Sequence, residues 1–343
     1  MVHRICVSRR AAWVLLAGIY LASSAAAQAA NTRNILLTGY WYPTNEMLAQ
    51  FSTDPLLNGN GWQGDNWEGR GYDVYAHFPT YPTGSGNKGV GDFEVDYQDT
   101  SDDFWRITDE IDPVAILSFG RGAGPWEVEY RAINRSSWNP DYLAPDLPTP
   151  SPPDSSMPAN AERYTTLPAS AIEAAVDGAG IGVDAWVDWN GNAGSFLCNY
   201  MFYHDTWYQA LHAAADDPNQ CVSAGFIHVA GALTVAQGAL ATEVTLREVI
   251  AYVGTQIPGF GDTDGDGDVD IEDISVLAAN WDQCGKTWAD GDFTGDGCVT
   301  IEDLSLLAAN WGAGTSSSSV PEPATLSALV LGGLAAVIRK GRR

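Results

Sequence analysis

Cysteine is scarce in this chain of 343 residues, which contains five. Cys6 lies in a segment that we expect to be removed, and four cysteines are too few to build a disulfide scaffold of this size. In an oxidising compartment Cys284 and Cys298 can form a local disulfide, and Cys221 can pair with Cys198. A hydrophobic core must supply most of the stability, and a chain with 45% hydrophobic residues can bury one.

Basic residues are also few. The chain has 17 Lys and Arg against 43 Asp and Glu, a formal net charge of -26. Binding to nucleic acid needs a basic face that neutralises phosphates. The charge balance therefore excludes nucleic acid as an expected partner, and it suits an exported protein or one that binds cations.

Long apolar runs are missing, and the first of the short ones lies at the N-terminus. A basic start that includes Arg9 and Arg10 precedes the apolar residues 11–21, and small-residue cleavage sites follow at 23–29. This order is typical of a secretory signal peptide, and the apolar run is short for a membrane anchor. We therefore assign residues 1–30 to a signal peptide and expect the mature protein to be secreted.

Apolar strand patterns alternate with helical patterns over most of the chain. Strands are predicted at residues 35–40, 72–78, 114–120, 126–134, 183–189 and 224–229. Helices are predicted at residues 100–110, 167–176 and 240–253, and a Pro-rich surface loop at 143–158. Such alternation predicts an α/β fold with a mostly parallel sheet that helices cover on both faces.

One cysteine lies where a glycine-containing turn runs into a predicted helix. Residues 191–200 place Cys198 at the start of this helix, whose dipole stabilises the thiolate, the reactive form of a cysteine. Thirty residues later, His228 follows on a predicted strand. This order favours a thiol–imidazole pair, and a small buried hydrophobic residue is the alternative for Cys198.

These segments together resemble the pyroglutamyl-peptidase (pyrrolidone carboxyl peptidase) family over about residues 33–253. The resemblance rests on residues 35–39, Glu129 with 132–134, 164–168, 192–199 and 225–229, in the order of the family. It implies a three-layer α/β/α sandwich and a Cys-His-Glu triad, with Cys198 as nucleophile, His228 as general base and Glu129 orienting the imidazole. The family removes N-terminal pyroglutamyl residues from peptides, and no cofactor is expected for this domain.

The chain also departs from the family. Glu127 competes with Glu129, because both lie on one face of the predicted strand. Where the family has a Phe-Glu-Pro-Phe-Gly-Gly segment, this chain has Tyr40, Trp41 and Tyr42, which either line the substrate pocket or belong to the core. The Trp-rich and Pro-rich loops look inserted. The prediction is a cysteine omega-peptidase, and the alternative is a catalytically inactive or re-purposed binding protein on the same fold.

Two copies of an acidic loop, thirty residues apart, follow this domain. Each resembles an EF-hand calcium loop, with oxygen ligands at positions one, three, five, nine and twelve and a glycine at position six. The expected ligands of two calcium ions are Asp262, Asp264, Asp266, Asp268, Asp270 and Asp273, and Asp292, Thr294, Asp296, Cys298, Thr300 and Asp303. Each loop leads into nearly the same predicted helix, at residues 271–281 and 301–311.

Aspartate at position twelve and a loop–helix pair without an entering helix resemble a type I dockerin, a small all-α calcium-binding module. That family binds cohesin modules on partner proteins. The resemblance implies that the contacts lie on the two similar helices, at Ser275, Val276, Leu277, Ser305, Leu306 and Leu307.

The end of the chain resembles the bacterial PEP-CTERM sorting signal. A Val-Pro-Glu-Pro motif begins at Val320, the apolar residues 326–338 follow, and Arg339 opens a basic tail. The resemblance implies transient anchoring in the inner membrane, followed by export to the cell envelope or surface. The expected domains are a signal peptide at 1–30, the peptidase-like domain at 31–258, the dockerin at 259–313, and a linker with the sorting signal at 314–343.

Overall fold

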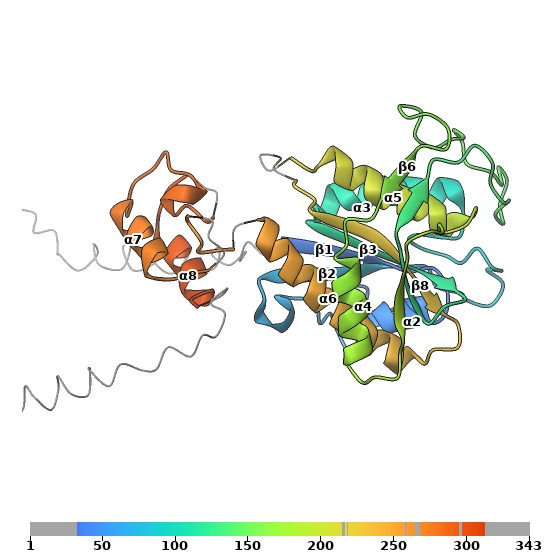
Figure 1. Cartoon of the computed structure of the whole chain (residues 1–343), viewed down its shortest axis with the longest axis horizontal. Coiled ribbons are helices and arrows are strands. Elements are labelled where there is room, and N and C mark those ends of the chain that lie inside the picture. Colours follow the sequence, from blue (N-terminus) through green and yellow to red (C-terminus); the bar gives the residue numbers. More distant parts are fainter. Residues whose placement is uncertain are drawn as a thin grey trace, which may run out of the picture. The chain divides into compact units, whose positions relative to one another are not determined.

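The structure is a computed structural model that describes residues 33–312 except 215–216, 218, 258, 265–267 and 295–296. The predicted signal peptide and sorting signal lie outside the described residues. The chain divides into two compact units after Gln256 (Figure 1). Among the described residues, no helix is long and apolar enough to cross a membrane.

The N-terminal unit is built on a six-stranded sheet with the order β2-β1-β3-β8-β4-β7. Its strands are β1 (Arg33–Thr38), β2 (Tyr72–His77), β3 (Ala115–Gly122), β4 (Trp126–Glu129), β7 (Ala185–Asp188) and β8 (Ser223–Ala230). Neighbouring strands are parallel except β4 and β8. Ile35, Leu36 and Leu37 have no exposed surface, because a central parallel strand is covered on both faces. The predicted α/β class and mostly parallel sheet are confirmed.

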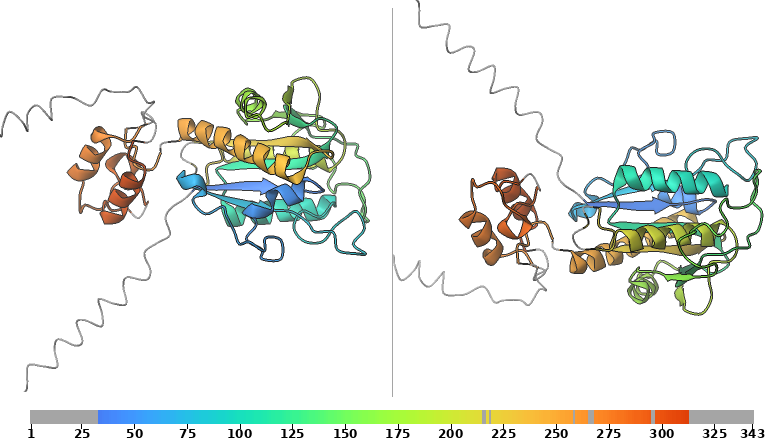
Figure 2. Two further views of the ribbon diagram at one scale, coloured as in Figure 1. Left: turned by 90° about the horizontal axis from the view of Figure 1, so that it is seen from below. Right: turned by 90° about the horizontal axis from the view of Figure 1, so that it is seen from above.

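Helices cover both faces of this sheet, and α3 and α6 lie on opposite faces (Figure 2). The helices are α2 (Thr44–Leu48), α3 (Tyr97–Ile111), α4 (Ala169–Gly178), α5 (Leu197–Leu211) and α6 (Val235–Gln256), with the 3-10 turns η1 (Ala49–Phe51) and η2 (Trp67–Gly69). Asp96 fixes the start of α3 by accepting hydrogen bonds from the amides of Gln98 and Asp99. Trp126 of β4 donates to Thr245 of α6 at 3.2 Å, which ties that helix to the sheet.

The predicted strand 126–134 is in fact two strands. After Glu129 the chain leaves the main sheet, and β5 (Arg131–Ile133) pairs with β6 (Glu162–Tyr164) in a separate antiparallel sheet. The carbonyl of Tyr130 accepts from the amide of Thr165 instead of from a neighbour in the main sheet. Glu129 is therefore the last residue of β4.

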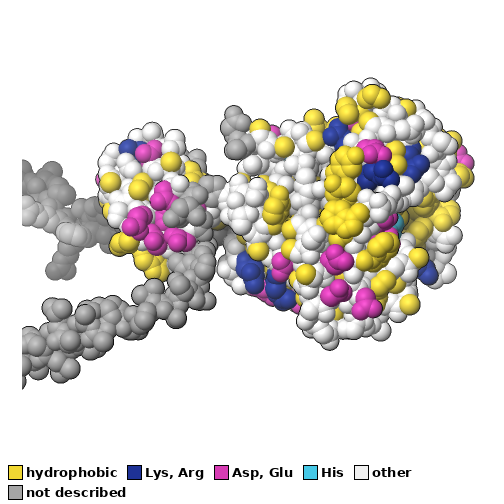
Figure 3. All heavy atoms as spheres, in the orientation of Figure 1, with side chains coloured by type: hydrophobic (Ala, Val, Ile, Leu, Met, Phe, Trp, Pro, Cys, Tyr) yellow, Lys and Arg dark blue, Asp and Glu magenta, His cyan; other side chains and the backbone are white. Residues whose placement is uncertain are grey.

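The C-terminal unit is a small helical module that contains the two acidic loops. Its elements are α7 (Ile271–Ala279), the 3-10 turn η3 (Trp288–Asp290) and α8 (Ile301–Ala309). Side chains of both repeats share one core, formed by Phe260, Val269, Leu277, Phe293, Val299 and Leu307. Acidic side chains gather on one face of the unit (Figure 3). The predicted repetition of loop and helix is confirmed.

Two of the residues predicted to contact a cohesin are core residues. Leu277 and Leu307 are each 1% exposed, so the prediction was wrong for these leucines. The physical reason is that each short helix turns one side inward at a spacing of three or four residues, and each leucine follows a buried aspartate at that spacing. The other predicted contacts are exposed or half-buried, and they are Ser275, Val276, Ser305 and Leu306.

The cysteines are distributed between a disulfide and two free thiols. Cys284 and Cys298 form a disulfide across a separation of 14 residues, which confirms that expected pairing. Cys198 and Cys221 are both free, so the pairing considered for them is wrong. Cys221 is completely buried just before β8, and Cys198 lies at the start of α5.

Candidate active site

Cys198 is the second residue of α5, so it lies at the positive end of a 15-residue helix. Within the described part of the chain, no side chain caps the first turn, because Phe196 occupies the N-cap position. Asp188 shapes the preceding turn by accepting from the amide of Gly191 at 2.8 Å, and Gly194 adopts φ +83°. The predicted turn into a helix at Cys198 is confirmed.

A buried amide ties the start of α5 to β5. Asn199 has no exposed surface, and its side chain accepts from the amide of Ile133 at 3.0 Å and donates to the carbonyl of Ile133 at 2.8 Å. These two bonds hold Cys198 near the segment that follows Glu129. No role for Asn199 was predicted, although an amide beside a candidate nucleophile in an apolar helix is a signal for a buried structural bond.

His228 and Glu129 form a close pair. The Nδ1 atom of His228 lies 2.6 Å from Oε1 of Glu129, and the two side chains are 13% and 2% exposed. The antiparallel register of β4 and β8 sets Glu127 directly opposite His228, and Glu129 follows two residues later on the same face. Both acids therefore face the imidazole, and Glu129 makes the hydrogen bond.

The thiol lies near this pair. A Cβ atom at Gly120, which is paired in register with His228, would lie 3.0 Å from Sγ of Cys198. Because Glu129 occupies Nδ1 of His228, Nε2 is the ring nitrogen open to the thiol. Burial lowers the pKa of His228, but the hydrogen bonds and negative charges of Cys198 and Glu129 outweigh burial and raise the pKa to about 10. The imidazole is therefore protonated at neutral pH, and a protonated imidazole stabilises a thiolate beside it.

Glu127 is a second acid at this place and differs from Glu129 in its surroundings. Burial and the negative charges of Glu129 and Asp188 raise the pKa of Glu127, against a smaller opposing effect of His228. One ligand-type atom from each of Glu127, Glu129 and His228 lies within 4.8 Å of the other two. These three side chains are therefore close enough to hold one metal ion.

Two glycines of β3 give the thiol and the imidazole their room. A Cβ atom at Gly120 would lie 2.5 Å from Cζ of Phe226 and 3.0 Å from Sγ of Cys198. A Cβ atom at Gly122 would lie 2.5 Å from Cβ of His228. Their role was not predicted, and the available signal was a pair of alternate glycines at the end of a buried strand.

The substitution Gly122→Ala is expected to lower kcat/KM of any reaction that uses His228 by about 100-fold, because a displacement of about 1 Å costs that much. The overpacked methyl group should also lower the free energy of unfolding by about 1–3 kcal/mol. Steady-state kinetics and urea unfolding measure the two effects. Gly178→Ala, whose added Cβ meets nothing within 4 Å, is the matched control, and equal losses in both variants would contradict the expectation.

The three aromatic residues predicted to line the pocket lie in different surroundings. Tyr40 is 3% exposed and belongs to the core, and Tyr42 is 51% exposed. Trp41 stacks on Phe196 with ring centroids 6.4 Å apart, and Tyr142 packs edge-on against both. Phe196 lies two residues before Cys198, so its stack with Trp41 places this aromatic pair near the start of α5, whereas Tyr40 takes the core alternative.

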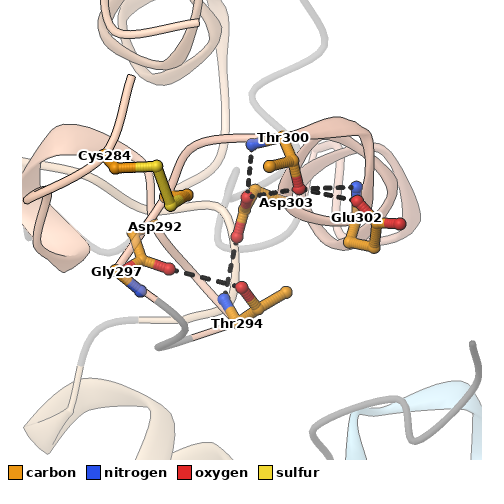
Figure 4. Close-up of a disulfide and its surroundings, with 8 residues drawn as sticks. Cys284, Asp292, Thr294, Gly297, Thr300, Glu302 and Asp303 are labelled. Carbon is orange, nitrogen blue, oxygen red and sulfur yellow. Dashed lines mark hydrogen bonds between the residues drawn. A yellow bond between two sulfur atoms is a disulfide. The ribbon is translucent and has the colours of Figure 1, made fainter. Parts of the chain in front are cut away.

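The two acidic loops of the C-terminal unit have matching geometry. In the first loop Asp273 accepts from two main-chain amides, each at 2.7 Å. In the second loop Asp303 accepts from the amides of Thr294 and Thr300 at 2.8 and 2.7 Å (Figure 4). Asp303 therefore lies at the centre of its loop and also closes the first turn of α8.

The donor atoms of these loops fit calcium. Asp262, Asp264 and Asp273 bring carboxylate oxygens within 4.8 Å of one another, as do Asp268, Asp270 and Asp273. Calcium prefers such sets of oxygen ligands. Two predicted ligands, Asp266 and Asp296, lie outside the described residues. The Sγ atom of Cys298 is part of the disulfide, so this predicted ligand can offer only its main-chain carbonyl, the group that position seven of an EF-hand loop supplies.

Comparisons with known proteins point to one family for the middle of the chain. Residues 111–244 match the family model described as pyroglutamyl peptidase. A pyrrolidone-carboxylate peptidase of Pseudomonas fluorescens (strain SBW25) is 34% identical over 128 residues, which are 36% of this chain and 53% of that protein. The chain thus spans about half the length of this curated relative.

Two solved structures are similar at a lower level. Pyrrolidone carboxyl peptidase from Thermococcus litoralis has a TM-score of 0.46 and 19% identity, covering 66% of this chain and 96% of that chain. Pyroglutamyl peptidase I from Bacillus amyloliquefaciens has a TM-score of 0.44 and 19% identity, covering 64% of this chain and 98% of that chain. Over residues 111–244, the segment that contains Glu129, Cys198 and His228, this chain is similar to pyroglutamyl peptidases.

Proposed function

We propose that the N-terminal unit is a cysteine peptidase that removes N-terminal pyroglutamyl residues from peptides. The observation that carries this proposal is the row of side chains formed by Cys198, His228 and Glu129. The similarity of residues 111–244 to pyroglutamyl peptidases supports the substrate class. Phe196 lies two residues before Cys198 and stacks on Trp41, so this aromatic pair is the candidate to hold an apolar ring beside the thiol.

Each residue has a defined role in this mechanism. The Cys198 thiolate attacks the carbonyl carbon of the pyroglutamyl residue, and His228 donates its proton to the leaving amine. Water then gives a proton to His228 and attacks the thioester, which releases pyroglutamate and regenerates the thiolate. Glu129 holds the imidazole through Nδ1 and stabilises its positive charge. The first-turn amides of α5 supply donors for the oxyanion.

The test is hydrolysis of fluorogenic aminomethylcoumarin amides by the full chain. We expect kcat/KM for the pyroglutamyl amide to exceed that for the prolyl and alanyl amides by at least about 100-fold, because a site that hydrogen-bonds a substrate group rejects analogues that lack it. Equal rates would contradict the substrate class. If no amide is cleaved and iodoacetamide does not alkylate Cys198, the unit is a binding protein on the same fold.

We propose that the C-terminal unit binds two calcium ions and attaches the protein to a cohesin-type module, in the manner of a type I dockerin. The repeated loop geometry around Asp273 and Asp303 supports calcium binding. Ser275 and Ser305 occupy equivalent exposed positions on α7 and α8, which supports an attachment surface on these helices.

Asp273→Asn is expected to weaken the binding of one of two calcium ions, with an affinity loss of about 10- to 100-fold at that site. Asp273 is 1% exposed and serves both candidate groups of ligands in its loop, so its charge is needed there. Isothermal titration with calcium measures the stoichiometry. Glu272→Gln removes the adjacent exposed charge and should keep both ions; equal losses in the two variants would show that net charge alone attracts the cation.

We also propose that the protein is exported. The signal-peptide pattern at residues 1–30 and the sorting pattern at 314–343 support passage through the inner membrane, transient anchoring there, and a final location at the cell envelope or surface. Terminal sequencing of the mature protein from the host would test both assignments. An intact N-terminus on the mature protein would contradict export through the signal.

A further inference from the structure

A set of metal-ligand side chains lies at the candidate active site and includes one residue that the proposed mechanism does not use. Glu127 of β4 is paired in register with His228 of β8, and Glu129 lies two residues further along the same face. One ligand-type atom of each lies within 4.8 Å of the others. Two carboxylates and an imidazole are a donor set that transition metals take in proteins.

One oxygen of this set is buried without a partner. Glu129 is 2% exposed, and while its Oε1 contacts His228, its Oε2 has no hydrogen-bond partner among the described residues. A buried carboxylate oxygen without a partner is costly, and a cation is a partner that would satisfy it. The protein groups described in the structure therefore leave part of this carboxylate's bonding capacity unused.

Apart from the proton that His228 must release, the charges around the set favour a cation. Asp188 of β7 lies beside Glu129 in the parallel register of β4 and β7, and its negative charge acts on Glu127. The guanidinium of Arg131 donates to the carbonyls of Asn190 and Gly191 and forms an ion pair with Glu162. Three carboxylates thus lie on the neighbouring strands β4 and β7, and the charge of the nearby arginine is paired elsewhere.

We propose that Glu127, Glu129 and His228 bind a divalent transition metal, with zinc as the expected ion, and that this binding inhibits the peptidase. The metal would bind Nδ1 of His228, the nitrogen that faces Glu129, and the proton held between these two groups would go to solvent. The metal thereby replaces the hydrogen bond that orients the imidazole. Only the inhibition rests on the proposed function, because metal binding needs no turnover.

The chemistry of the set separates this site from the other cation sites of the chain. The imidazole nitrogen favours zinc or cobalt over calcium, which takes oxygen ligands, so calcium that fills the C-terminal loops should not compete here. Cys198 does not belong to the group of ligand-type atoms that lie within 4.8 Å of one another, so it is not expected to be a ligand. Binding should therefore survive removal of the thiol.

The experiment is titration of the full chain with Co²⁺ in saturating calcium, followed by absorption spectroscopy. We expect one equivalent of Co²⁺ with d–d bands and without a thiolate-to-cobalt band, displaced by zinc and retained in Cys198→Ser. Glu127→Gln should lower the affinity by at least about 10-fold. Glu46→Gln, which removes an exposed carboxylate of α2, is the matched control and should leave the affinity unchanged.

Two results would overturn the site. One is a thiolate band that disappears in Cys198→Ser, which would place the metal on the thiol. The other is equal affinity in Glu127→Gln and Glu46→Gln. Circular dichroism checks folding, and Glu127→Asp, which withdraws the carboxylate, gives the same comparison if the glutamine variant is unfolded. Zinc that binds without slowing hydrolysis would overturn the inhibition, whereas no hydrolysis by the metal-free chain would refute the peptidase and leave the metal result intact.

Discussion

Replacing Cys198 by alanine is expected to abolish hydrolysis of the pyroglutamyl amide and to lower kcat by about 10⁴- to 10⁶-fold. The variant lacks the sulfur that forms the thioester. His228 and Glu129 then have no nucleophilic side chain to activate. Removal of the sulfur atom should leave the fold intact, because the Cys198 side chain is only half-buried. Residual fluorescence release, measured with excess enzyme, sets the upper limit on the remaining rate.

Cys221 provides the matched control, since it is the other free thiol among the described residues. It is completely buried, and burial raises the pKa of its thiol, so it should neither react with iodoacetamide nor contribute to turnover. Cys221→Ala should keep a kcat near that of the unmodified chain. Peptide mapping should find the alkyl group on Cys198 alone. Turnover that persists in Cys198→Ala would remove this residue from the role of nucleophile.

Periodicity predicted the central sheet because buried parallel strands carry continuous apolar runs, as β1 and β3 do. It could not predict that β4 runs antiparallel to β8, since the direction of a pair depends on which strands become neighbours in space. That pairing sets Glu127 opposite His228. The sequence resemblance favoured Glu129 but left Glu127 as a competitor, and the side-chain geometry gives the hydrogen bond to Glu129.

The start of α5 was predictable because a glycine turn and an apolar helix are local signals. Asn199, Gly120 and Gly122 escaped prediction because each acts through a contact with a segment distant in sequence. The prediction that Leu277 and Leu307 contact a partner was wrong for a related reason. Short helices that are apolar over much of their surface do not show from sequence which apolar side chains face inward.

Glu129→Gln is expected to lower kcat by about 10⁴-fold, the loss seen when the orienting carboxylate of such a triad becomes an amide. Glutamine keeps the shape but cannot stabilise a positive imidazole. Glu129 is one of the groups that raise the pKa of His228 to about 10, so its removal should lower that pKa. The alkaline limb of kcat/KM, where the imidazolium loses its proton, should therefore move from about pH 10 to lower pH.

Glu127→Gln is the matched comparison, because it removes the other carboxylate from the same face of β4. In the described part of the chain, Glu129 makes the hydrogen bond to His228, and the pKa of Glu127 is raised, so Glu127 carries less of the negative charge that the imidazole feels. We expect a much smaller loss of kcat and a smaller movement of the alkaline limb. Since each variant removes one carboxyl group, the difference between them isolates the hydrogen bond from the local charge. A larger loss in Glu127→Gln would assign the orienting role to Glu127.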